Sequence, residues 1–166
     1  MHRRRAVKSK VKVNSWQLGL WFAFSLIFAC LQSNADTLKP FTSDGCSAFP
    51  DGTLQQNQLW LACCIEHDKA YWQGGTYQQR VAADDALQSC VEAVGEQAIA
   101  LLMLAGVRVG GSPYFPTSFR WGYGWRYPKF YGQLTDEELT QIKQQWQHYS
   151  NSLVENPTSS PMANPK

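Results

Sequence analysis

The chain has no excess of basic residues once its first 35 positions are set aside. Residues 36–166 hold nine Lys/Arg against 13 Asp/Glu, a net charge of −4, although the whole chain carries +2. Proteins that bind nucleic acid need a basic surface, because contacts with phosphate dominate their affinity. The composition therefore argues against nucleic acid as a partner, and 166 residues suffice for one domain with a modest core.

Acidic residues are absent from residues 1–35, and this segment has no apolar run long enough to span a bilayer. Six Lys/Arg precede an apolar run of 12 residues, Leu18 to Ala29, and the small residues Ser33-Asn34-Ala35 follow. That order is typical of an export signal with its cleavage site. We predict a signal peptide over residues 1–35, export to the periplasm or the extracellular space, and no transmembrane segment in the mature chain.

Two other interpretations of this leader stay open. One is an uncleaved membrane anchor. The other is a lipoprotein anchored at Cys30, although the bulky Phe28 two residues earlier suits lipoprotein processing poorly.

Cysteine is scarce, and without the leader four remain: Cys46, Cys63, Cys64 and Cys90. An even number in an exported chain of this size indicates two disulfide bonds. A zinc site is a weaker alternative, because adjacent cysteines lack the usual two-residue spacing of zinc ligands. A thiol redox protein that uses Cys63 and Cys64 is a further class that the sequence leaves open.

A helix is predicted from Leu59 to Gly74-Gly75, where the glycines end the apolar periodicity. Cys63, His67 and Tyr71 are spaced four residues apart and therefore share one face of this helix. A crosslink, a base and a phenol would then face the same neighbour.

A second, longer helix is predicted from Gln78 to about Ala105. Its apolar stripe comprises Val81, Leu87, Val91, Val94, Ala98 and Leu101 or Leu102. The stretch from Ala98 to Leu104 is apolar on all sides, so we expect this end of the helix to be buried.

The short connection makes the two helices antiparallel neighbours, and facing residues then have a nearly constant sum of residue numbers. Cys63 with Cys90 gives 153, and His67 gives 151 with Asp84 and 152 with Asp85. One register can therefore close a disulfide and bring a carboxylate to the imidazole, which holds it in one tautomer and makes it a better general base. Periodicity does not decide between the two acids.

The same register leaves Cys64 to bond Cys46, which would hold the loop of residues 44–52 beside Asp68. This loop contains two Asp-Gly turns. Such loops can supply oxygen ligands to a hard cation such as Ca²⁺, although most Asp-Gly turns bind no metal.

Residues 107–131 are rich in aromatic side chains, which recur at every second position from Phe119 to Tyr127. This period indicates an extended segment with one aromatic face, although the surrounding glycines and prolines disfavour a regular sheet. The segment is either a strap packed over the helix pair or a lipid-facing surface. In the second case phosphate would meet its basic residues, Arg108, Arg120, Arg126 and Lys129.

A third helix is predicted after Thr135, which forms a capping box with Glu138. Its apolar stripe predicts docking on the rest of the domain. The stripe consists of Leu139, Ile142, Trp146 and Tyr149. The composition from Glu155 onward predicts a disordered tail over residues 155–166, and therefore a domain over residues 36–154.

Cys63, Cys64, His67, Asp68 and Tyr71 form the motif Cys-Cys-x-x-His-Asp-x-x-Tyr. On the second helix Asp84 stands six residues before Cys90, and Gly45-Cys46-Ser47 forms a glycine-bearing turn upstream. In these features, between residues 44 and 91, the chain resembles the secreted phospholipase A2 family.

The resemblance implies a mainly α fold of the phospholipase A2 type. Its elements would be an antiparallel, disulfide-linked helix pair with a calcium loop, followed here by an extra C-terminal helix. It implies the bonds Cys46–Cys64 and Cys63–Cys90, and it selects Asp84 as the partner of His67.

The resemblance also implies an enzyme that hydrolyses the sn-2 acyl ester of glycerophospholipids with Ca²⁺, at a phospholipid membrane surface that it contacts peripherally. His67 would activate water, with Asp84 and Tyr71 as its supports. The implied ligands of Ca²⁺ are Asp68 and loop carbonyls near Gly45, Ser47 and Phe49. The alternative is a catalytically silent module on the same scaffold that binds lipid or a partner.

Overall fold

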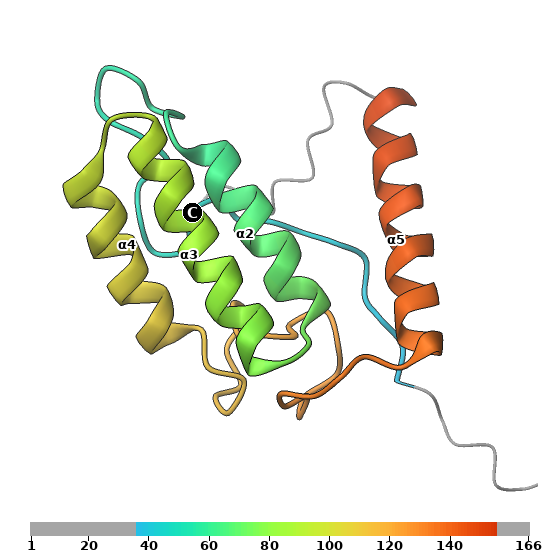
Figure 1. The fold of residues 1–166 in the computed structure, drawn as a ribbon. Helices are drawn as coiled ribbons and strands as arrows, with labels where there is room; N and C mark the ends of the chain where they lie inside the picture. Colours follow the sequence, from blue (N-terminus) through green and yellow to red (C-terminus); the bar gives the residue numbers. More distant parts are fainter. Residues whose placement is uncertain (1–35, 156–166) are drawn as a thin grey trace, which may run out of the picture. The chain divides into compact units, whose positions relative to one another are not determined.

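The computed structural model describes residues 36–155, which form four helices and no β-strand within that range (Figure 1). The helices are α2 (Leu61–Gln73), α3 (Tyr77–Ala93), α4 (Gln97–Gly110) and α5 (Asp136–Glu155). The mainly α fold class is confirmed for this part of the chain. None of these helices is both long and apolar enough to cross a membrane.

Some predictions fall on residues that the structure does not describe. The signal peptide over residues 1–35, with Cys30, lies outside the described residues, and so do residues 156–166 of the predicted tail. The first residue of that tail, Glu155, belongs to α5.

Helices α2 and α3 form the antiparallel pair that the sequence predicts (Figure 1). A short turn follows α2, and Thr76 begins α3 with a capping box. The register brings Cys63 to Cys90 in a disulfide with Cα atoms 5.7 Å apart. A second disulfide joins Cys46 to Cys64. Both predicted bonds are confirmed, so the four cysteines of residues 36–155 serve neither as zinc ligands nor as free thiols.

The prediction of one helix over residues 78–105 is wrong, because Gly95 ends α3 and starts a reversal. Gly95 has a φ of +91°, a region that glycine enters without steric penalty. Its N–H donates to the carbonyl of Glu92, and the next N–H donates to the carbonyl of Val91. These are the hydrogen bonds of a Schellman motif, which terminates a helix. Helix α4 then runs back beside α3 (Figure 1).

The break also changes which apolar residues of this region are buried. Ala100 and Met103 are buried, whereas Val94, Leu101 and Leu102 are 40%, 53% and 58% exposed. The expected buried end at residues 98–104 is therefore wrong. Helix α4 packs one face against the core and leaves several apolar side chains on the surface.

Residues 111–132, which we call the aromatic strap, contain turns rather than the expected extended segment. The strap packs on the C-terminal end of α2, where the last carbonyls of a helix lack partners within the helix. Three of its donors bond these carbonyls: Gly122 N to Tyr71 O at 2.7 Å, Gly124 N to Trp72 O at 3.2 Å, and Trp125 Nε1 to Gln73 O at 2.7 Å. The interpretation as a packed strap is thus supported.

Most of the basic residues around the strap are engaged inside the protein rather than turned outward. Arg120 is buried and donates to the carbonyls of Gly122 and Trp125. Lys129 forms an ion pair with Glu138 of α5. For these two side chains the structure favours the interpretation as a packed strap over contact with lipid phosphate.

Helix α5 docks on the side of α2 that faces away from α3. The predicted capping box is present, since Thr135 and Glu138 each bond the backbone N–H of the other. Ile142 joins a buried cluster with Phe41 and Trp72, and Trp146 packs against it. Leu139 is half exposed, so the predicted stripe packs only from its second turn.

We predict that Gly124→Ala destabilises the protein by about 1–3 kcal/mol through overpacking. A Cβ at this position would lie 2.4 Å from the Trp72 ring and 2.7 Å from Leu38. Gly132→Ala is the matched control, because a Cβ there meets nothing within 4 Å. Chemical denaturation measures both, and equal midpoints for the two variants would contradict the close packing of the strap on α2.

Candidate active site

Helix α2 directs His67 and Tyr71 at one carboxylate of α3. His67 Nε2 lies 3.0 Å from Asp84 Oδ1, and the Tyr71 hydroxyl donates to the same oxygen at 2.7 Å. Asp84 is fully buried, whereas Asp85 is exposed and turned away from the imidazole. The structure therefore brings together the three residues predicted as catalytic, and it excludes Asp85 as the partner of His67.

The hydrogen bond fixes which ring nitrogen of His67 carries the proton. An ionised carboxylate is only an acceptor, so Nε2 must donate to Asp84. Nδ1 then keeps its lone pair, and His67 lines the cavity described below. An imidazole held in one tautomer in this way can accept a proton from a molecule in the cavity.

Tyr71 remains a phenol because burial, and then the charge of Asp84, raise the pKa of its hydroxyl above the ordinary value. The hydroxyl accepts a hydrogen bond from Arg80 Nε at 3.0 Å and donates to Asp84. The aromatic strap supports its ring, with Trp121 packed edge-on at 5.1 Å between ring centroids. Tyr71 is thus held from the strap and from α3 at once.

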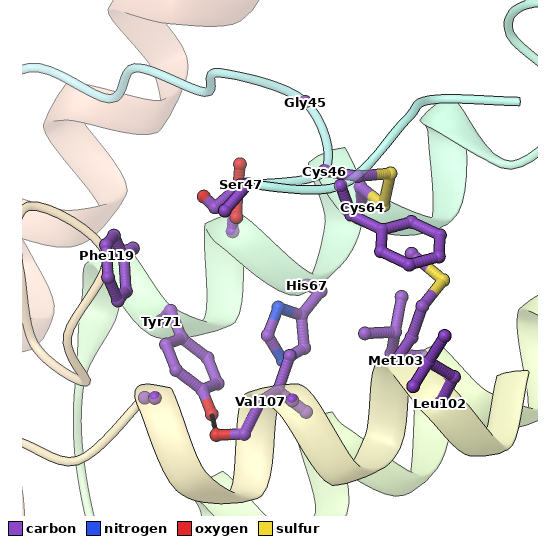
Figure 2. Close-up of a pocket in the computed structure, with 17 residues that line it drawn as sticks. Gly45, Cys46, Ser47, Cys64, His67, Tyr71, Leu102, Met103, Val107 and Phe119 are labelled. Atoms are coloured by element: carbon purple, nitrogen blue, oxygen red, sulfur yellow. Dashed lines mark hydrogen bonds between the residues drawn. A yellow bond between two sulfur atoms is a disulfide. The ribbon is translucent and has the colours of Figure 1, made fainter. Parts of the chain in front are cut away.

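A cavity of about 400 Å³ opens beside His67 (Figure 2). Its walls come from the loop of residues 45–49, from α2, from Leu87 of α3, from α4 and from Phe119 of the strap. Six residues of the predicted site line this one cavity: Gly45, Ser47, Phe49, His67, Asp68 and Tyr71. Asp84 lies behind the imidazole, so the chemical groups predicted from the sequence converge on one space.

The loop keeps its shape through local bonds. Cys46 is tied to α2 by its disulfide, and its N–H donates to Asp51 Oδ1 at 2.8 Å. Gly45 has a φ of +74°, and a Cβ there would lie 2.4 Å from the same Asp51 oxygen, so the turn requires glycine. Ser43 Oγ donates to Asp68 Oδ2 at 2.6 Å and connects the loop to α2.

The donor chemistry of this wall fits a calcium ion. Within residues 36–155 no three His, Cys, Asp or Glu side chains form a metal site. A cation here would use one carboxylate, that of Asp68, and would take its other ligands from the loop residues that line the same cavity. Ca²⁺ prefers such oxygen ligands, including backbone carbonyls.

Two arginines lie on the far side of Asp84, and the sequence reasoning did not find them. Arg108 Nε is 3.1 Å from Asp84 Oδ2, with angles of an ion pair rather than a hydrogen bond, and Arg80 Nε is 3.9 Å from the same oxygen. Arg80 stands four residues before Asp84, a spacing that was readable as an ion pair on a helix. Arg108 was placed in the aromatic segment of residues 107–131, because a separate helix α4 was not foreseen.

No family model, curated protein or solved structure matches this chain.

We predict that Tyr71→Phe destabilises the protein by about 1–3 kcal/mol, because it removes a partner from buried Asp84 and from buried Arg80. Tyr77→Phe is the matched control, since Tyr77 is exposed and should change stability by less than about 0.5 kcal/mol. Thermal and chemical unfolding measure both. Tyr71→Phe with the stability of Tyr77→Phe would mean that the hydroxyl bridge contributes nothing.

Proposed function

We propose that this protein is a calcium-dependent esterase of the phospholipase A2 type, which hydrolyses the sn-2 acyl ester of glycerophospholipids. One observation carries the proposal: His67, with its buried carboxylate partner, faces the same cavity as Asp68 and the loop of residues 45–49. A base and an oxygen-rich cation wall around one space are what metal-assisted ester hydrolysis requires. The phospholipase A2-like fold is part of the same proposal.

His67, Asp84 and Tyr71 have separate roles in the proposed reaction. His67 Nδ1 accepts a proton from a water molecule as the water oxygen bonds to the ester carbonyl carbon. The imidazolium then gives this proton to the leaving alkoxide oxygen as its bond to the carbonyl carbon breaks, which releases the fatty acid and the lysophospholipid. Asp84 Oδ1 keeps the imidazole oriented and compensates the charge that the imidazole gains. Tyr71 donates to the same oxygen and so restricts its movement.

The cavity wall formed by Asp68 and the loop of residues 45–49 would hold the calcium ion that acts on the ester. Asp68 and the carbonyls of Gly45, Ser47 and Phe49 would hold the ion. When bound, Ca²⁺ supplies positive charge to the ester oxygen, where negative charge develops. The disulfide at Cys46 and the bond from Ser43 to Asp68 keep this wall in position without the ion.

The walls of the cavity suit an acyl chain. Leu102, Met103 and Val107 of α4 line it, and Gly106 and Gly110 of the same helix leave room beside them. Two lining side chains also reach the surface, since Leu102 is 58% and Phe119 is 40% exposed. A phospholipid surface is a partner that could cover these side chains and deliver the chain to the cavity.

The disulfides indicate an oxidising compartment, as expected for an exported protein. We propose the periplasm or the extracellular space as the place of action.

A silent lipid-binding module is the second candidate, because the exposed apolar side chains do not depend on His67. It predicts vesicle binding that Tyr114→Ser and Phe115→Ser weaken, with no release of fatty acid. The proposed enzyme requires both binding and release.

We predict release of fatty acid from phospholipid vesicles in the presence of Ca²⁺ and its loss in EGTA. His67→Gln should lower the rate at least about 100-fold, since it removes the general base. Asp68→Asn should abolish the stimulation by Ca²⁺.

His148→Gln serves as the control, because this histidine is exposed on α5 and should retain the wild-type rate. Equal rates with Ca²⁺ and with EGTA would contradict calcium dependence. Equal rates for the two histidine variants would contradict the assigned base.

We predict that Gly106→Leu selectively impairs long acyl chains. Gly106 lines the cavity and a Cβ there meets nothing within 4 Å, so a leucine should fit without displacing the backbone and should narrow the cavity. The rate on a long-chain phospholipid should fall about tenfold or more, and that on a short-chain analogue should fall less. Ala105→Leu, on an exposed position of the same helix, is the control. An equal loss on both substrates would argue against α4 as the acyl-chain wall.

A further inference from the structure

The two oxygens of Asp84 have separate partners. Oδ1 receives the bonds from His67 and Tyr71, at 3.0 and 2.7 Å. Oδ2 faces the two arginines, with Arg108 Nε at 3.1 Å and Arg80 Nε at 3.9 Å. A carboxylate can turn about its Cβ–Cγ bond, and a partial turn would move Oδ1 out of line with the imidazole and the phenol. The ion pair on Oδ2 opposes that turn.

We propose that Arg108 is a positioning residue for the reaction at His67: it holds Oδ2 of Asp84 and thereby keeps Oδ1 on the imidazole. The catalytic part of this inference rests on the proposed function, whereas the structural part does not. Arg108 contacts Asp84 and has no contact with the substrate space, since it does not line the cavity.

Arg80 is poorly placed for this role, because four of its five N–H donors bond other groups and its Nε lies 3.9 Å from Oδ2. Its Nε donates to Tyr71 and its Nη1 donates to Tyr131. Its Nη2 donates to the carbonyls of Val107 and Arg108, at 2.7 and 2.9 Å. Arg80 therefore anchors the last turn of α4, and that turn carries Arg108 to Asp84.

Arg108 is held from its other side as well. Its Nη2 pairs with Asp85 Oδ1 at 2.5 Å and donates to the carbonyl of Val81 at 3.3 Å. The guanidinium thus bridges two adjacent carboxylates of α3, one buried and one exposed. A planar guanidinium suits this bridge better than an ammonium group, because it presents several donors in a fixed arrangement. Asp85, excluded as the partner of His67, acquires a role as the outer support of Arg108.

The charge balance points to the same conclusion. A buried carboxylate without a cationic partner is costly. Arg108 and Arg80 place two guanidinium groups beside Oδ2, so the cationic partners of Asp84 lie on the side away from the imidazole.

The test compares Arg108→Leu and Arg108→Lys with the wild type and with Lys143→Leu, a control that removes an exposed cation from α5. Hydrolysis is measured with Ca²⁺ present. Arg108→Leu should lower kcat about 10–100-fold and leave KM within about twofold, as for other residues that orient a reacting group. Arg108→Lys should recover part of kcat, because it restores the charge but not the bridge to Asp85.

Wild-type kcat in Arg108→Leu, a change confined to KM, or an equal loss in Lys143→Leu would overturn the inference. Should Arg108→Leu fail to fold, Arg108→Gln is judged by the same criteria. It retains a polar side chain but no charge.

A second readout keeps the test independent of activity. Long-range ¹H–¹⁵N NMR spectra report the tautomer of His67. We expect a single Nε2–H tautomer in the wild type and a mixture in Arg108→Leu. Wild-type protein without hydrolysis would refute the proposed function alone, and an unchanged His67 spectrum in Arg108→Leu would refute the positioning role alone.

Discussion

The buried carboxylate of Asp84 is the constraint on which the rest of the structure depends. An ionised group with no exposed surface is tolerated only when surrounding groups pair with it. Its partners come from three helices: His67 and Tyr71 from α2, Arg80 from α3 and Arg108 from α4. The antiparallel register, the reversal at Gly95 and the length of α4 are all needed to bring these groups to one point. The site is therefore also the place where the helices are fitted together.

The aromatic strap connects the residues around Asp84 to a second buried cluster, which includes Phe41, Trp72 and Trp125. It binds the last carbonyls of α2, so the helix keeps its C-terminal turn and Tyr71 keeps its direction. It also sends Tyr131 to Arg80 and Trp121 to the ring of Tyr71. Glycines allow the strap to approach the end of α2 closely, since a Cβ on Gly74 would come within 3.0 Å of Gly122. Residues of the strap, which the sequence did not mark as part of the site, thus fix the orientation of Tyr71 and Arg80.

Sequence reasoning predicted the parts that local spacing determines. The four-residue spacing on α2, the sum of residue numbers across the helix pair and the cysteine count led to both disulfides and to a contact of His67 with Asp84 or Asp85. The choice of Asp84, which the structure bears out, came from the resemblance to a known family. Sequence reasoning failed at the end of α3, because the apolar pattern continues past it. Gly95 was the readable signal of a helix end, but the apolar residues after it continued the helical pattern. Without that reversal, Arg108 could not be seen as a partner of Asp84, because its contact depends on tertiary folding.

The two disulfides begin at adjacent residues of α2 and extend to different segments, Cys63 to α3 and Cys64 to the loop. One side of the cavity is consequently crosslinked at both of its elements. The opposite side, formed by α4, is joined to α3 through Gly95 and held to it only by non-covalent contacts. The cavity therefore has one wall that disulfides crosslink and one that only non-covalent contacts hold. Under the proposed function, a wider acyl chain would be accommodated at Gly106 and Gly110 of α4, while the crosslinked side keeps His67 and Asp68 at a constant spacing.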